Sequence, residues 1–412
     1  MYFIYNILVH VSSFFLKIVA LFNKKLGLFV QGRKTVFEVL SSQIQKEDNV
    51  IWFHTASLGE YEQGLPVLEA LKKKFPHHTF VLTFFSPSGY EVKKNSGVAD
   101  IITYLPLDTK ANAKKFIKLV HPELVVFVKY EFWPNYLAEL KKQEIYTISI
   151  STIFRPSQAF FKFYGGWMRK SLHAFDHIFV QNEASKKLLE SIHYKNVTVS
   201  GDTRFDRVLE IVKHDNSLAF IADFKNTRTC VVIGSSWAED EALFVPFINT
   251  SEEDCKFIIA PHNIKSQEIQ KLKNSITKST VLFSELEQHT DLSQFDVFIV
   301  DTIGILTKVY SYATIAYVGG GMGTSGLHNT LEPAVFGIPV MIGKNYTGFK
   351  EAEDLVQLGG VLSVKSPSEF KSTLTNLLKD TDFSSSVGTI NHHYVHKNGN
   401  ASEVIMAHLS NR

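Results

Sequence analysis

The glycine-rich segment at residues 319–333 contains the residues of this chain that most clearly indicate a chemical function. It reads GGGMGTSGLHNTLEP and follows an apolar run at residues 315–318 that predicts a buried strand. The apolar residues from Leu331 to Phe336 predict a helix after it. A strand, a glycine loop and a helix in this order direct backbone N–H groups at a phosphate, and glycines such as Gly320 and Gly321 let the backbone approach the ligand.

Glu332 extends this prediction from a phosphate to a nucleotide. It would lie just inside the helix, about one turn from the phosphate, where its carboxylate could accept hydrogen bonds from ribose hydroxyls. The alternative is a plain glycine-rich turn in which Glu332 is a first-turn charge favoured by the helix dipole. The His-Asn-x-x-Glu-Pro continuation at residues 328–333 favours the nucleotide site.

A second candidate segment, HTASLGE at residues 54–60, follows the first apolar strand. Glu60 would lie near the carboxyl end of that strand and take a proton from an acceptor hydroxyl as a general base. The spacing Ser57-x-x-Glu60 is also a capping-box pattern, in which Glu60 would only accept the backbone N–H of Ser57. One carboxylate oxygen could serve each role.

Polar residues also follow other predicted strands. Glu131, Trp133 and Asn135 come after the strand at residues 124–128, either where an acceptor binds or as a capped turn with Trp133 in the core. In the second half, strand ends carry Ser235 and Ser236, Pro261 and His262, and Gly304. Because ligands bind at the carboxyl ends of parallel strands, we expect these residues to converge on one site.

Two segments indicate a membrane surface. Residues 2–22 are almost wholly apolar, have Lys17 as their formally charged side chain, and are close to the ~20 residues that a spanning helix needs. Basic residues at 24, 25, 33 and 34 follow and would keep the body of the protein in the cytoplasm. A single span, an interfacial helix and a buried first helix of a soluble domain are all compatible with this pattern. Residues 160–170 mix aromatic and basic side chains, which suits a membrane–water interface or a core helix with a basic edge.

The composition describes a globular chain with an ample core. Of its 412 residues, 45% are hydrophobic and 20% are charged, which makes two domains of ordinary size the default. A net charge of +2 gives no argument for a nucleic-acid partner. Cys230 and Cys255 each begin an apolar run, without metal-ligand spacing, so buried reduced thiols are favoured over a disulfide.

Apolar runs of strand length alternate with amphipathic stretches along the whole chain. Continuous runs of valine, isoleucine, leucine and phenylalanine are typical of parallel strands covered on both faces. The predicted strands occupy residues 50–54, 79–84, 101–104, 124–128, 145–150, 177–180 and 197–200, then 230–233, 256–260, 281–283, 297–300, 315–318, 339–342 and 361–364. This pattern predicts an α/β fold of two doubly wound, Rossmann-like domains facing across a cleft.

The domain boundaries follow from the same pattern. We expect a membrane anchor or interfacial helix at residues 1–22, a first domain at 23–205 and a second domain at 229–390. Residues 206–228 are polar, contain no strand and predict a linker. A helical tail at residues 391–412 is expected to pack back on the N-terminal domain.

Taken together and in order, these segments resemble the 3-deoxy-D-manno-octulosonic acid (Kdo) transferases of lipopolysaccharide synthesis, glycosyltransferases of the GT-B architecture. The resemblance covers nearly the whole chain. Besides the apolar N-terminus, it rests on HxxSxGE at residues 54–60, the turn at 86–91, ExWPN at 131–135, GDTRFD at 201–206, GSS at 234–236, AP at 260–261, DTxG at 301–304 and HNxxEP at 328–333.

The resemblance implies inverting transfer of Kdo from CMP-Kdo to a lipid A precursor at the cytoplasmic face of the inner membrane, without a catalytic metal or a cofactor. It implies that Glu60 is the general base and that Glu131, Ser57 and Arg155 lie on the acceptor side. The implied donor-binding residues are Ser235, Ser236, Pro261, His262, Gly304, Gly320, Gly321, Asn329 and Glu332.

The chain departs from the family pattern at three places. The Gly-Glu-Leu segment after the Asp-Thr motif becomes residues 304–306 (GIL). An Ala-Pro-Arg-His segment becomes APHN at residues 260–263, so an expected phosphate-binding arginine is missing, and His262, Lys265 or Arg204 could replace it. An Asn-Ala-Arg segment becomes residues 151–153 (STI), with Arg155 two places on.

Three other functions remain open on the sequence. A GT-B transferase that uses a UDP-sugar would share the fold and Glu332. A nucleotide-sugar epimerase of the same architecture would need no acceptor. A non-catalytic lipid-binding protein would not need Glu60.

Overall fold

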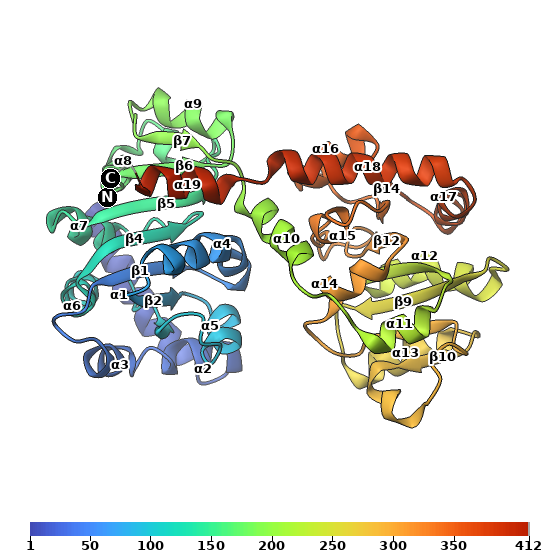
Figure 1. The fold of residues 1–412 in the computed structure, drawn as a ribbon. Coiled ribbons are helices and arrows are strands. Elements are labelled where there is room, and N and C mark those ends of the chain that lie inside the picture. The colour runs from blue at the N-terminus through green and yellow to red at the C-terminus, as the bar shows by residue number, and fades with distance from the viewer. Residues whose placement is uncertain (411–412) are drawn as a thin grey trace. The chain divides into compact units, whose positions relative to one another are not determined.

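The computed structural model describes residues 1–410 and divides the chain into two α/β units. Residues 1–207, joined by the C-terminal residues from 399 onward, form the first unit, and residues 208–398 form the second. Each unit is built on a seven-stranded parallel sheet (Figure 1). The expected α/β fold with two doubly wound sheets is confirmed, and every predicted strand is present to within a few residues.

The first sheet has the strand order β3-β2-β1-β4-β5-β6-β7. Its strands are β1 Val50–Thr55, β2 Thr79–Phe84, β3 Ile101–Tyr104, β4 Pro122–Val128, β5 Tyr146–Thr152, β6 His177–Val180 and β7 Val197–Val199. The helices of this unit are α1 Tyr2–Val19, α2 Lys24–Gln31, α3 Val36–Gln43, α4 Leu58–Lys74, α5 Pro87–Lys93, α6 Lys110–Val120, α7 Pro134–Lys142, α8 Gly166–Leu172, α9 Glu183–Ser191 and α19 Ala401–Ser410.

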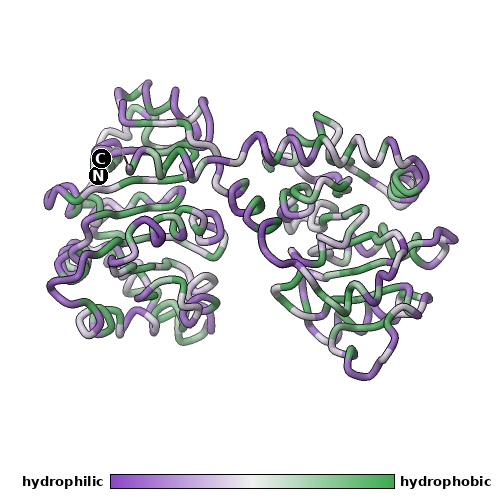
Figure 2. Tube along the Cα trace, in the orientation of Figure 1, coloured by the Kyte–Doolittle hydropathy of each residue, from purple (hydrophilic) through white to green (hydrophobic). Residues whose placement is uncertain are grey.

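The central strands of this sheet are apolar because helices cover both faces. β1 is buried along its whole length. Trp52 on β1 packs against Phe116 of α6 and Tyr136 of α7 on one face, while Phe53 belongs to the core under α4 on the other. In Figure 2 the strands of both sheets are coloured mainly as hydrophobic segments. The result is a rigid sheet whose strand ends can present polar side chains.

The second sheet has the strand order β10-β11-β9-β8-β12-β13-β14. Its strands are β8 Thr229–Ser236, β9 Cys255–Pro261, β10 Thr280–Leu282, β11 Val297–Ile299, β12 Ile315–Val318, β13 Val340–Ile342 and β14 Val361–Ser363. The helices are α10 Thr203–Lys213, which begins in the first unit, α11 Ala219–Lys225, α12 Ala238–Thr250, α13 Ser266–Ser275, α14 Leu306–Val309, α15 Leu331–Ala334, α16 Lys350–Leu358, α17 Pro367–Lys379 and α18 Thr381–Asn398. Cys230 and Cys255 are free buried thiols, as expected.

Two predicted segments differ in local structure. The polar stretch at residues 206–228, predicted as a linker, contains most of α10 and all of α11, and as expected it has no strand. The helix predicted after the glycine loop is present but ends two residues before Phe336, because α15 is a single turn, Leu331–Ala334. The chain leaves the helix through Gly337, whose φ of +69° a residue with a side chain rarely adopts.

The C-terminal helix α19 belongs to the first unit. Its backbone N–H groups at Ala401 and Ser402 donate to the carboxylate of Asp206, at 3.2 and 2.9 Å. Ile405 and Leu409 join the core under α4. Asp206 therefore acts as a cap for α19, which explains one residue of the GDTRFD segment.

Helix α1 lies along the first unit with one face packed against it. The partly buried positions Tyr5, Val9, Ser13 and Leu16 recur every three or four residues, so they form one stripe. The Tyr5 hydroxyl donates to the buried Asp108 carboxylate at 2.6 Å. The rest of α1 presents large exposed apolar side chains: Phe3, Ile4, Ile7, Leu8, Val11, Phe14, Phe15 and Ile18.

Candidate functional site

The glycine loop of the second unit is held by the buried carboxylate of Asp240. This residue lies in the first turn of α12, and its oxygens accept hydrogen bonds from the Gly320 N–H at 2.8 Å and the Tyr317 hydroxyl at 2.8 Å. The Trp237 N–H donates to it at 3.0 Å. Burial raises the pKa of the Asp240 carboxyl, while these donors oppose the rise. Asp240 thus joins the ends of β8 and β12 through hydrogen bonds that would be costly to lose.

Gly320 and Gly321 allow close backbone packing inside the loop. Gly320 has a φ of +89°, and a Cβ there would lie 2.2 Å from the Gly326 carbonyl oxygen. A Cβ on Gly321 would lie 3.0 Å from the Gly343 nitrogen. The Gly320 N–H is occupied by its hydrogen bond to Asp240. Gly320 therefore contributes to the shape of the loop.

Trp237, His262 and His328 form a stacked cluster beside the loop. The Trp237 and His262 rings lie 4.4 Å apart at 19°, and the His262 and His328 rings lie 4.6 Å apart. The Trp237 indole N–H donates to His328 Nε2 at 3.1 Å. His262 also donates its backbone N–H to the Ser236 carbonyl at 2.9 Å. The cluster brings together the ends of β8, β9 and β12, so His262 and Ser236 share one edge with the glycine loop.

Burial, together with the neighbouring His262, lowers the pKa of His328 from 6.5 to about 4. The folded state therefore keeps His328 neutral while the unfolded chain binds a proton below pH 6.5, so stability falls as the pH drops from about 6.5 towards 4. We expect His328→Gln, which keeps a hydrogen-bond acceptor, to lose less stability over this window than the wild type, by roughly 1–2 kcal/mol after allowance for partial exposure. Urea unfolding of both proteins at pH 7 and pH 4.5 measures this difference. Equal losses would contradict it.

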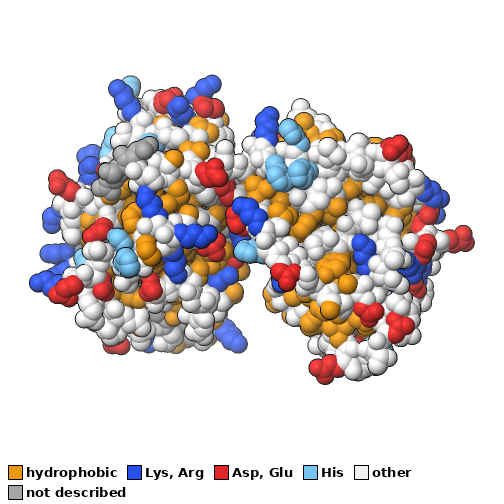
Figure 3. All heavy atoms as spheres, in the orientation of Figure 1, with side chains coloured by type: hydrophobic (Ala, Val, Ile, Leu, Met, Phe, Trp, Pro, Cys, Tyr) orange, Lys and Arg blue, Asp and Glu red, His pale blue; other side chains and the backbone are white. Residues whose placement is uncertain are grey.

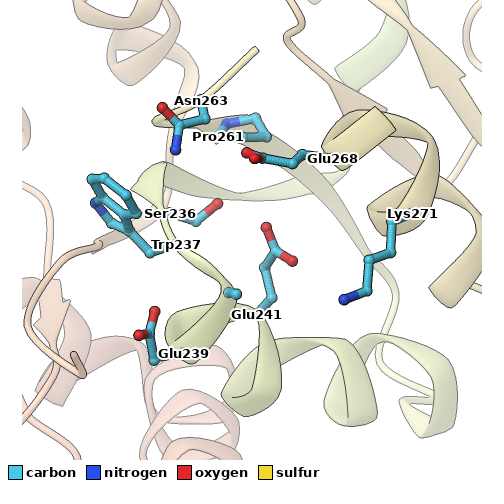
Figure 4. Close-up of a pocket in the computed structure, with 9 residues that line it drawn as sticks. Ser236, Trp237, Glu239, Glu241, Pro261, Asn263, Glu268 and Lys271 are labelled. Carbon is cyan, nitrogen blue, oxygen red and sulfur yellow. The ribbon is translucent and has the colours of Figure 1, made fainter. Parts of the chain in front are cut away.

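A pocket of about 350 Å³ opens between the start of α12 and α13 (Figure 4). Its lining residues are Ser236, Trp237, Ala238, Glu239, Glu241, Pro261, Asn263, Glu268 and Lys271. Ser236 is 2% exposed, and its hydroxyl points into this space without a hydrogen-bond partner in the described chain. A buried hydroxyl of this kind is normally paired, so a ligand or water is expected there. Ser236 and Pro261 were both predicted donor-site residues.

Asn329 and Glu332 lie at the start of the one-turn helix α15. The Asn329 amide donates to Glu332 Oε1 at 3.2 Å, and its carbonyl accepts the Leu331 N–H at 3.2 Å. Burial, followed by the charge of Glu332, raises the pKa of the Tyr310 hydroxyl well above its ordinary value. A Cβ on Gly234 would lie 1.9 Å from that hydroxyl, which places Tyr310 under the end of β8. Glu332 thus lies on the glycine-loop side of the sheet edge.

Two predicted donor residues stand apart from these contacts. Ser235 has a φ of +54°, an uncommon backbone conformation for serine, and its carbonyl would lie 2.4 Å from a Cβ on Gly319. Gly304 lies in an exposed loop after β11, with a φ of +96°, and a Cβ there would meet no atom within 4 Å. Among the candidate cations, Lys265 forms an ion pair with Glu268 at 3.2 Å, and Arg204 in the first unit pairs with Asp202 at 2.8 Å.

In the first unit, Glu60 lies in the first turn of α4, directly after β1. The capping box predicted as an alternative does not form, because no side chain caps the Ser57 end of the helix. Instead the Ser57 hydroxyl donates to Glu60 Oε2. No hydrogen bond from residues 1–410 reaches the other carboxylate oxygen, Oε1. Glu60 is half-buried, so one oxygen is oriented by Ser57 and the other can accept a proton.

The Glu131 carboxylate contacts His54, which lies near the end of β1. The His54 Nε2 and Glu131 Oε2 atoms lie 3.0 Å apart, and the Trp133 indole N–H donates to the same oxygen at 2.8 Å. His54 Nδ1 lies 2.8 Å from the Thr83 hydroxyl, which also accepts from the Trp52 indole N–H at 2.8 Å. The neighbouring strands β2, β1 and β4 thus hold one carboxylate in place.

Arg155 follows β5, which neighbours β4, and is exposed. Its guanidinium lies 5.7 Å from the centre of the Tyr130 ring, in the loop that carries Glu131. The backbone of Lys129, at the start of that loop, is left-handed with a φ of +67°. Strained backbone of this kind concentrates at functional sites. The predicted acceptor-side residues therefore share the carboxyl edge of the first sheet.

Sequence reasoning assigned no role to His54, Asp240 or Trp237, although all three lie within the segments that it selected. His54 opens the segment that ends at Glu60, and Trp237 and Asp240 follow Ser236. Their hydrogen-bond partners, Glu131, Gly320 and His328, lie 77 to 91 residues away in the sequence. A local pattern contains no signal for such pairs.

The two α/β units, each on a parallel seven-stranded sheet, have the architecture of the GT-B class. A UDP-GlcNAc 2-epimerase from Neisseria meningitidis aligns over 88% of this chain and all of its own, with a TM-score of 0.63 at 17% identity. MurG from Acinetobacter baumannii aligns over 89% of this chain and all of its own, with a TM-score of 0.55 at 10% identity. These likenesses show the fold.

Sequence relatives define the family. Residues 30–207 match the family model described as 3-deoxy-D-manno-octulosonic-acid transferase. A 3-deoxy-D-manno-octulosonic acid transferase from Aquifex aeolicus is 30% identical over 83% of this chain and 91% of its own length. One from Chlamydia trachomatis serovar D is 27% identical over 90% of this chain and 87% of its own. The chain belongs to the Kdo transferase family and is a glycosyltransferase.

Proposed function

We propose that this chain moves Kdo from CMP-Kdo to a lipid A precursor, with inversion at the transferred carbon and Glu60 as the general base. The observation that carries the proposal is the family membership, at 30% identity over 91% of a Kdo transferase. The geometry of Glu60 supports the assigned role, since Ser57 holds one oxygen and the other is free to take the acceptor proton. General-base catalysis typically contributes ~10²–10⁴-fold to the rate.

The acceptor side is formed by the carboxyl edge of the first sheet. In this proposal Glu131 accepts a hydrogen bond from an acceptor hydroxyl, and His54 and Trp133 keep its carboxylate in one orientation. Arg155 is exposed beside the same loop and suits a phosphate of the acceptor. The first sheet would thus hold the nucleophile while Glu60 deprotonates it.

The donor side is formed by the second unit. Glu332 and Asn329 bind the ribose of CMP, and the backbone and His262 at the end of β9 face the phosphate, whose charge must be stabilised as CMP departs. The pocket beside Ser236 suits the hydroxyl-rich sugar, because Glu241, Glu268 and Asn263 can accept hydrogen bonds from its hydroxyls and Lys271 can pair with its carboxylate. Pro261, at the end of β9, lines the same pocket.

Transfer of radiolabelled Kdo onto a lipid A precursor, read by product size, tests the proposal. A labelled product with CMP release supports the proposal. Absence of transfer when CMP-Kdo and the lipid A precursor are both present overturns it. A transferase specific for a UDP-sugar would bind UDP more tightly than CMP. An epimerase would act without acceptor, and a lipid-binding protein would release no CMP.

We also propose that α1 attaches the protein to the cytoplasmic face of the inner membrane as an interfacial helix. Tyr5 and Leu16 lie on the stripe that packs along the first unit, so the helix cannot cross a bilayer and keep those contacts. Its other faces expose mainly apolar side chains, and the helix as a whole has a mean hydropathy of 1.5 over residues 2–19. That arrangement favours burial at the headgroup boundary.

Replacing Leu8 and Phe15 by glutamate should release the protein from vesicles. Both side chains are exposed, 57% and 58%, and burying each in lipid is worth about 1.5–3 kcal/mol. Flotation with phosphatidylcholine–phosphatidylglycerol vesicles should show a more than 100-fold loss of binding. The double variant Val92→Glu with Leu358→Glu, at exposed apolar positions elsewhere, is the control. If the α1 variant still floats, attachment lies elsewhere, for instance at residues 160–170.

A further inference from the structure

A second pocket, of about 420 Å³, lies where the N-terminal end of α1 meets α7 and α8. Its lining residues are Tyr2, Pro134, Leu137, Ala138, Lys141, Trp167, Lys170, Ser171 and Ala174. All belong to the first unit, and Figure 1 shows the N-terminus beside α7 and α8. The volume is within the roughly 300–1,000 Å³ of small-molecule sites. Nothing in the proposed transfer reaction uses this pocket.

The interior of the pocket is apolar. Leu137 is fully buried at its base, and Pro134 and Ala174 are buried beside it. Trp167 is half-buried, with its ring centre 5.8 Å from that of Tyr5 on α1. The lining contains no acidic residue among those described. An apolar chain would be favoured in such a space over water.

The rim is positively charged. Lys141 at the end of α7 and Lys170 on α8 are both exposed and line the opening. No ion pair from residues 1–410 engages either ammonium. A third ammonium, of Lys110, lies 5.0 Å from the Tyr2 ring. Lysines with apolar stems beside an apolar pocket suit a phosphate at the membrane surface.

We propose that this pocket binds one acyl chain of an anionic phospholipid, with the lipid phosphate between Lys141 and Lys170. The proposal rests on the membrane attachment of α1 proposed above, but it does not depend on Kdo transfer. Tyr2 at the start of α1 lines the pocket and is followed by the exposed Phe3 and Ile4, and Phe163 before α8 is 96% exposed. A chain leaving the bilayer beside α1 would therefore enter without crossing water.

The same contacts connect lipid binding to the acceptor loop. The Tyr2 hydroxyl donates to the Asn135 side chain at 2.6 Å, and Asn135 lies in the first turn of α7. The Asn135 N–H donates to Asp108, the residue that Tyr5 also holds. Glu131 lies four residues before Asn135. A lipid in the pocket would hold α1 against the helix that follows the acceptor loop.

Trp167 offers a direct readout for the full-length chain. Bromine on an acyl chain quenches indole fluorescence only on contact. We expect vesicles of phosphatidylcholine with chain-brominated phosphatidylglycerol to quench Trp167, measured as the difference between the wild type and Trp167→Phe. Brominated phosphatidylcholine beside unlabelled phosphatidylglycerol should quench it far less. Ala138→Phe, at an exposed position of the lining, should fill the space and abolish the quenching while flotation persists.

The double variant Lys141→Gln with Lys170→Gln should weaken phosphatidylglycerol-dependent quenching by roughly tenfold. Lys186→Gln with Lys187→Gln on α9 is the charge-matched control and should leave the phosphatidylglycerol-dependent quenching unchanged. The proposal is overturned if Ala138→Phe is quenched like the wild type. Equal quenching by both brominated lipids, or equal effects of both lysine pairs, would also overturn it. Circular dichroism confirms folding, and Kdo transfer to detergent-dispersed acceptor tests the proposed function separately.

Discussion

Glu60→Gln should lower Kdo transfer by at least ~10²–10⁴-fold and leave CMP binding unchanged. The amide preserves the size of the side chain and its hydrogen bond from the Ser57 hydroxyl, but it cannot accept a proton at neutral pH. Glu60 belongs to the first unit, whereas the residues proposed to bind CMP belong to the second. The change should therefore act on the turnover number. Initial rates with saturating donor, together with calorimetric titration of CMP, measure the two effects.

Glu69→Gln is the matched control for this experiment. Glu69 lies on the same helix α4 and is exposed, so its change alters the charge of the helix equally. It should retain normal transfer. Near-normal turnover of Glu60→Gln would remove Glu60 from the mechanism, and a parallel loss of CMP affinity would mean that the change disturbs more than the base.

Asp240→Ala should destabilise the second unit by about 3–5 kcal/mol and greatly weaken CMP binding. Its carboxylate accepts from the Gly320 N–H, the Tyr317 hydroxyl and the Trp237 N–H. Removing it leaves three donors unsatisfied in a buried place, at about 1–3 kcal/mol each and not fully additive. The glycine loop would lose the bond that joins it to β8. Urea unfolding and CMP titration measure the loss.

Two further variants separate the effect of the Asp240 charge from the effect of its hydrogen bonds. Asp240→Asn keeps one acceptor oxygen and should be intermediate, while Tyr317→Phe removes one donor together with its need for a partner and should be mild. A stable Asp240→Ala protein with wild-type CMP affinity would show that the loop keeps its shape without this carboxylate. On the face shown in Figure 3, acidic and basic side chains are interspersed on both units.

The strands of both sheets were predictable from the sequence because the physical cause is local. A parallel strand covered on both faces is mainly apolar, and residues 79–84, 101–104 and 315–318 show this without any knowledge of their neighbours. The candidate residues followed as well, since the carboxyl ends of such strands share one edge of the sheet. Glu60, Glu131 and the glycine loop were found in this way.

Only the tertiary structure decided what those residues contact. The pattern Ser57-x-x-Glu60 is compatible with a capping box and with a side-chain pair, and the structure has the pair. The glycine loop was predicted to direct backbone N–H groups at a phosphate, and the structure has the Gly320 N–H bonded to Asp240, 80 residues earlier. Likewise the apolar pattern of α1 allowed three placements, and contacts such as the one between Tyr5 and Asp108, 103 residues apart, place one face of the helix along the first unit. Hydrophobic periodicity is a property of neighbouring residues, whereas the partner of a buried polar group depends on which distant segments the chain brings within hydrogen-bond distance.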